Sequence, residues 1–148
     1  MQLEGFTRAD MNALTTQRRN PCVSIFLPSH RVTMESQQDQ IRYKNLLRKA
    51  EDKLKALGFE DPEGMMEPAR SILKDTAFWA HQGDGLAAFI SNDLFRRYRV
   101  PMPLEELVCV SDRFMMKPLF PLLTGNGRFF ILALSEKIVR LFESTRHD

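Results

Sequence analysis

Residues 39–57, DQIRYKNLLRKAEDKLKAL, carry the strongest structural pattern in the chain. Apolar side chains recur there every three or four residues, at Tyr43, Leu46, Leu47, Ala50, Leu54 and Leu57. That period places them on one face of an α-helix, and such a face must be covered by another layer. Ser36 with Asp39 predicts where the helix begins, and Gly58 predicts where it ends.

Strands are predicted on both sides of this helix. Residues 22–27, CVSIFL, are apolar at nearly every position, which is typical of a strand in the interior of a sheet. Three further strands are predicted at residues 83–91, 94–100 and 107–110.

Shorter helices are predicted at residues 7–19, 61–73 and 118–123. Thr7 with Asp10 predicts a capping box for the first of them. Pro68 falls inside the second and predicts a kink or a restart there. Phe78 and Trp79 are predicted to lie in a short connection. Together the pattern predicts an α+β fold, with a mixed or antiparallel sheet, two long helices packed on one side and a β-hairpin at the end.

The predicted hairpin consists of residues 128–135, RFFILALS, and 137–143, KIVRLFE. A two-stranded ribbon alone is marginally stable in water and needs further strands or a helix. Few residues follow it, so we expect the chain to be the front part of a longer protein. Residues 1–126 would then form one domain, and residues 127–148 would be the first hairpin of a truncated middle domain.

Composition excludes several classes of protein. The 148 residues are 43% hydrophobic and 27% charged, which is ordinary for a globular domain. A net charge of +2 is too small to indicate nucleic-acid binding by itself. Cys22 and Cys109 lie in apolar runs without a CxxC motif, so no metal site and no cofactor are predicted. The chain shows neither a signal peptide nor a membrane span, which favours a cytoplasmic protein.

Basic residues suggest two candidate surfaces for RNA. The polar face of the long helix carries the cations Arg42, Lys44, Arg48, Lys49, Lys53 and Lys55, against Glu51 and Asp52 only. Cations gain affinity from phosphates whatever the base sequence, although a solvated helix face has the same composition. The second cluster is Arg96, Arg97 and Arg99, where Tyr98 could stack on an unpaired base. The alternative there is an edge strand protected by charge.

The loop Ser29-His30-Arg31 follows a strand, a common position for functional residues, and is a candidate functional loop. Packing or helix capping by His30 is the alternative. Asp84 and Asp112 lie beside strand ends, so a paired-carboxylate site is conceivable.

The order of elements and several motifs resemble the archaeo-eukaryotic peptide-chain release factor family, in its bacterial branch. Residues 22–31, CVSIFLPSHR, resemble the family's first strand ending in proline, and residues 83–91, GDGLAAFIS, resemble its glycine-led strand. Residues 108–114, VCVSDRF, and the following segment to residue 143 resemble the passage from the N-terminal to the middle domain.

Two departures limit what the resemblance implies. Residues 40–45, QIRYKN, stand where stop-codon-reading members carry Asn-Ile-Lys-Ser, and the chain contains no Gly-Gly-Gln tripeptide. The resemblance therefore implies a non-catalytic module that acts on the ribosome or ribosomal RNA in rescue, hibernation or a termination-related role, with no DNA or membrane partner. The alternative is a small RNA or nucleotide hydrolase with a site near His30, Arg31, Asp84 and Asp112.

Overall fold

A strand with apolar side chains on both faces needs neighbours on every side, and β1 (Cys22–Pro28) has them. In this computed structural model, which describes residues 6–16, 20–30, 35–80 and 83–123, β1 lies inside a four-stranded sheet of order β3-β2-β1-β4. The other strands are β2 (Gly85–Ser91), β3 (Leu94–Val100) and β4 (Leu107–Ser111). Every adjacent pair is antiparallel, which decides between the predicted alternatives of a mixed and an antiparallel sheet.

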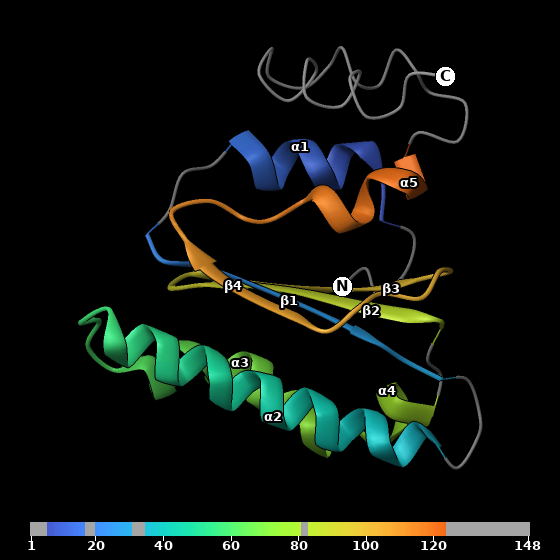
Figure 1. Ribbon diagram of the computed structural model, residues 1–148, viewed down its shortest axis with the longest axis horizontal. Helices are drawn as coiled ribbons and strands as arrows, with labels where there is room; N and C mark the ends of the chain where they lie inside the picture. The colour runs from blue at the N-terminus through green and yellow to red at the C-terminus, as the bar shows by residue number, and fades with distance from the viewer. Residues whose placement is uncertain (1–5, 17–19, 31–34, 81–82, 124–148) are drawn as a thin grey trace.

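Helices cover both faces of this sheet (Figure 1). On one face, Val23, Ile25 and Leu27 of β1 pack against α2 (Glu35–Ala56) and α3 (Pro62–Ser71). The predicted packing of two helices on one side is therefore confirmed, and the fold is α+β.

The opposite face of the sheet is also covered. Phe26 of β1 and Phe89 of β2 pack there against Met11 and Leu14 of α1 (Arg8–Thr16), and against Leu119. Leu119 ends the 3-10 helix η2 (Lys117–Leu119), which continues into α5 (Phe120–Leu123) as the sequence predicts. A sheet whose central strand is apolar on both faces requires this second layer.

The helix α1 begins with the predicted capping box. The Asp10 carboxylate accepts hydrogen bonds from the Thr7 backbone N–H (2.9 Å) and hydroxyl (2.8 Å), and the Asp10 N–H donates to the Thr7 hydroxyl at 3.2 Å. These contacts satisfy donors that a helix start otherwise leaves free. The predicted end of this helix at Arg19 lies outside the described residues.

The long helix α2 begins earlier than predicted. It starts at Glu35, so Asp39 lies inside the helix and does not cap it. At its other end, Gly58 adopts a φ of 90°, the Gly58 N–H donates to the Lys55 carbonyl and the Phe59 N–H donates to the Leu54 carbonyl. This is a Schellman motif, which ends the helix where the sequence predicts.

The helix α3 has the predicted Asp61 cap, whose carboxylate accepts from the Gly64 N–H at 3.1 Å. No restart occurs at Pro68, because the helix runs to Ser71 and then tightens into the 3-10 helix η1 (Ile72–Lys74). Phe78 and Trp79 lie in the short helix α4 (Thr76–Ala80) and not in an irregular connection. The predicted hairpin at residues 128–143 lies outside the described residues.

Replacing Gly58 tests the end of α2. Gly58→Ala should lower the free energy of unfolding by about 1–2 kcal/mol, because a side chain disfavours the left-handed conformation there. No atom lies within 4 Å of the added Cβ, so the loss should be conformational and not steric. Gly58→Asn should cost less, since Asn tolerates this conformation. Urea denaturation measures both, and equal stability of all three proteins would contradict the assignment.

Candidate functional site

The outward face of α2 presents cations to solvent. Lys44, Arg48, Lys49 and Lys53 are exposed and lie outside the buried stripe of Tyr43, Leu47, Ala50 and Leu54. A turn of 100° per residue places Lys44 and Arg48 on one flank of the solvent-facing half of the helix, and Lys49 and Lys53 on the other. Within the part of the chain that the structure describes, none of these four cations forms an ion pair. Their charge is therefore available to a partner.

Charges on the side of α2 that faces α3 are neutralised within the fold. Lys55 forms an ion pair with Glu63 at 3.2 Å, and Glu51 forms one with Arg70. The helix pair thus satisfies the charges at its own interface and leaves those of the outward face unpaired.

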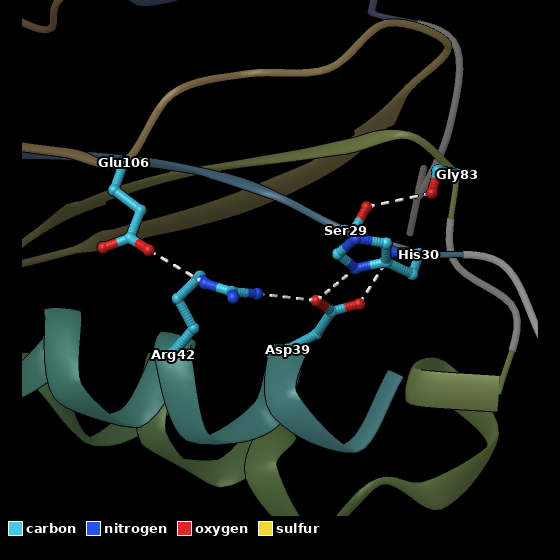
Figure 2. Close-up of polar contacts among 6 residues, drawn as sticks. All are labelled: Ser29, His30, Asp39, Arg42, Gly83 and Glu106. Atoms are coloured by element: carbon cyan, nitrogen blue, oxygen red, sulfur yellow. Dashed lines mark hydrogen bonds and ion pairs between the residues drawn. The ribbon is translucent and has the colours of Figure 1, made fainter. Parts of the chain in front are cut away.

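Arg42 differs from these four exposed cations, because its guanidinium is part of a polar network. Its Nη1 donates to the Asp39 carboxylate at 3.0 Å, and its Nε lies 2.8 Å from the Glu106 carboxylate. The guanidinium thereby links the first half of α2 to the residue just before β4 (Figure 2). Because Arg42 is held by two carboxylates and only 29% exposed, it has less free charge to offer RNA than Lys49 or Lys53.

His30 is held by the same buried carboxylate, as Figure 2 shows. Asp39 is fully buried, and it accepts hydrogen bonds from the His30 backbone N–H at 2.7 Å and contacts His30 Nδ1 at 2.8 Å. An imidazole fixed at Nδ1 keeps Nε2 for a further partner. The Asp39 carboxylate, near the end of β1, is therefore contacted by the backbone N–H and Nδ1 of His30 and by the guanidinium of Arg42.

A groove of about 440 Å³ runs beside this network. Its walls come from one flank of α2 and from Glu106, and its lining residues are Gln38, Ile41, Arg42, Asn45, Leu46, Lys49 and Glu106. The lining combines both signs of charge with two apolar side chains, so it indicates no single class of ligand.

The predicted cluster on β3 is divided between the two faces of the sheet. Successive side chains of a strand point to opposite faces, so Arg96 and Tyr98 lie on the α1 side while Arg97 and Arg99 lie on the α4 side. Tyr98 is 1% exposed and donates to Asp10 at 3.3 Å. Burial raises the pKa of its phenol. The predicted stacking of an unpaired base on Tyr98 is therefore wrong, because the ring belongs to the core.

The predicted pairing of Asp84 with Asp112 is also wrong. Gly85, which follows Asp84, pairs with Pro28 at the end of β1, whereas Ser111, which precedes Asp112, pairs with Cys22 at its start. The two aspartates thus lie at opposite ends of the sheet, roughly 20 Å apart at about 3.3 Å per residue.

The remaining residues of the candidate functional loop have structural contacts or lie outside the described residues. The buried Ser29 hydroxyl donates to the Gly83 carbonyl at 3.0 Å, and the Ser29 N–H donates to the Asp84 carbonyl at 3.1 Å. These bonds continue the pairing of β1 with β2 by one residue. Arg31 lies outside the described residues.

Asp39 and Glu106 were not predicted as partners of the site residues. Asp39 did leave a signal, because it lies four residues before Tyr43 and seven before Leu46, on the apolar face of the helix. A carboxylate in an apolar stripe indicates a buried charge that needs hydrogen-bond donors. Glu106 had no such signal in the sequence, because its approach to Arg42 depends on how β4 joins the sheet.

Comparison with family models and with curated proteins identifies no relative of this chain. The resemblance to release factors stays a prediction that the sequence motifs carry. No helix in the described ranges is both long enough and apolar enough to cross a lipid bilayer.

Replacing Asp39 tests the polar network. Asp39→Asn should lower the free energy of unfolding by about 2 kcal/mol, because a neutral amide cannot satisfy the three donors of His30 and Arg42. Glu106→Gln is the matched control and should cost less than about 1 kcal/mol, since Glu106 is half-exposed. Urea denaturation at neutral pH measures both. Equal costs for the two variants would show that Asp39 does not organise the network.

Proposed function

We propose that this chain is the RNA-contacting module of a cytoplasmic, translation-linked protein. In this proposal it is the non-catalytic N-terminal part of a bacterial release-factor-like protein and acts on the ribosome in rescue, hibernation or a termination-related step. The motif resemblance supports the choice of family. The arrangement of charge on α2 supports RNA as the partner.

The supporting observation is a set of four exposed cations on α2, Lys44, Arg48, Lys49 and Lys53, which form no ion pair with any residue that the structure describes. Each cation that meets a phosphate releases condensed counterions, which gives affinity independent of base sequence. The chain's net charge of only +2 makes this local concentration of charge the more informative quantity.

The fold also holds these cations in fixed relative positions. Tyr43, Leu47 and Leu54 anchor the opposite face of the helix in the core. Successive turns of α2 therefore present the cations along roughly 14 Å of one rigid element, from position 44 to position 53 at 1.5 Å per residue. A rigid array loses less conformational freedom on binding than the same side chains on a loop.

Neutralising the array tests the proposal. A variant with Lys44, Arg48, Lys49 and Lys53 all replaced by Gln should bind ribosomes or ribosomal RNA fragments more weakly. The slope of log K against log salt concentration should become shallower by about three, because four phosphate contacts are lost. Binding measured over a salt series gives both quantities.

The control keeps the same change in net charge. Arg8, Lys74, Arg113 and Lys117 are exposed and lie outside α2, and their replacement by Gln should leave the slope near that of the wild type. If both quadruple variants lose affinity equally, the attraction follows net charge and the α2 surface is not the RNA site. If the wild type itself does not bind, the proposal is wrong.

A second candidate function is hydrolysis of RNA or a nucleotide, with His30 as the general base. The observation that favours it is the contact of His30 Nδ1 with the buried Asp39 at 2.8 Å, which orients the ring. Asp39 replaces the previously predicted Asp112 in this site.

The enzyme candidate has its own test. His30→Gln should reduce hydrolysis on the order of 10²-fold or more, because proton transfer by a positioned base is lost. The quadruple α2 variant should keep its kcat in the same assay. Absence of any hydrolysis by the wild-type protein, with RNA and with nucleoside triphosphates, would eliminate this function.

A further inference from the structure

Two arginines meet on one aromatic ring at the outer strand β3. The guanidinium carbon of Arg97 lies 4.6 Å from the centroid of the Phe78 ring, and that of Arg99 lies 5.2 Å from the same centroid. Phe78 is 3% exposed and packs edge-on against Trp79 at 5.0 Å. The ring is therefore part of the core, and it holds both cations in place.

The charge of Arg97 is incompletely balanced. Its Nε is buried without a hydrogen-bond partner, and among the described residues no carboxylate forms an ion pair with it. Asp75 exerts some attraction, but its carboxylate accepts the Phe78 N–H at 3.0 Å as the cap of α4. Burial lowers the pKa of the Arg97 guanidinium, since the charged form loses hydration. A nearby anion would favour that charged form.

The neighbouring Arg99 adds a second positive charge, which an anion would also stabilise. Arg97 and Arg99 carry like charges and repel one another, and Arg99 acts on Arg97 in the same direction as burial. Two guanidinium groups fixed by one ring match a ligand with several oxygens and up to two negative charges. Phosphate meets this description, and planar guanidinium groups bind it through paired N–H donors.

We propose that Arg97 and Arg99 form a binding site for a phosphate group at the β3 edge of the sheet. The site is separate from the cations of α2, because α2 contacts β4 and β1 whereas β3 forms the opposite edge. It does not depend on the proposed binding of ribosomal RNA.

Arg96 supplies a matched control within the same strand. It lies on the other face of β3, where its charge acts on the phenol of Tyr98. Arg96 and Arg97 thus have similar exposure and adjacent positions, but only Arg97 shares a ring with Arg99. A ligand held by the pair should distinguish the two residues.

The test is a titration with inorganic phosphate, followed through the arginine Nε–Hε signals in ¹H–¹⁵N NMR spectra at constant ionic strength. The Arg97 and Arg99 signals should shift with one saturating curve, while the Arg96 signal stays in place. Arg97→Gln should weaken phosphate binding by about tenfold or more, as expected for the loss of a charge-assisted bidentate contact. Arg96→Gln should change it by less than about twofold.

Two further variants keep the result interpretable if Arg97→Gln does not fold. Arg97→Lys retains the charge but loses the planar pair of donors, and Arg99→Gln removes the other cation. Both should weaken binding by several-fold, with folding checked by circular dichroism. The quadruple α2 variant should bind phosphate as the wild type does, so failure of the RNA proposal and failure of this one are distinguishable.

The source of the phosphate is tested with a nucleoside 5′-monophosphate and the matching nucleoside. Equal affinity for inorganic phosphate and the nucleotide indicates a site for the free anion, whereas tighter binding of the nucleotide indicates a phosphorylated ligand. The nucleoside should shift neither signal. Equal shifts at Arg96 and Arg97, or unchanged binding in both Arg97→Lys and Arg99→Gln, would overturn the proposal.

Discussion

Burial of β1 on both of its faces and along both of its edges is the constraint on which the fold depends. Six of its seven residues are buried, and only Pro28 at its end is partly exposed. One face of the strand requires α2 and α3, and the other requires α1 and the segment that contains Leu119. The candidate functional groups lie on elements that cover this strand, continue it or belong to its sheet.

Asp39 connects the central strand to the long helix. Its carboxylate lies in the apolar face of α2 but binds His30, which follows the end of β1, and Arg42, which reaches Glu106 beside β4. A buried charge of this kind is tolerated only when several donors surround it. The same network pairs the charge of Arg42, which is then less available to RNA, and it orients the ring of His30. It therefore influences both the proposed RNA binding and the candidate hydrolysis.

The distribution of ion pairs separates structural charges from available ones. Charges between α2 and α3 are paired, whereas those on the outward face of α2 are not. Arg97 and Arg99 form a different case, since both guanidinium groups lie over the aromatic ring of Phe78. The basic residues of this chain therefore do not form one continuous surface, and each group has its own physical setting.

Local patterns were sufficient for the identity of most elements. The capping box of Thr7 and Asp10, the Schellman end at Gly58 and the interior character of residues 22–27 depend on neighbours in sequence, so they could be predicted. The exposed cations of α2 were predictable for the same reason, because the helical period separates them from the buried stripe.

Contacts between distant residues were decided only by the tertiary structure. Strand register places Asp84 and Asp112 at opposite ends of the sheet, and the second helical layer buries Tyr98. The meeting of His30 with Asp39, of Arg42 with Glu106 and of two arginines with Phe78 depends on strand order and on packing between layers. The sequence by itself determined most of the segments that form helices and strands, since those depend on local periodicity. The sheet order and the packing of its layers determined which side chains share a site.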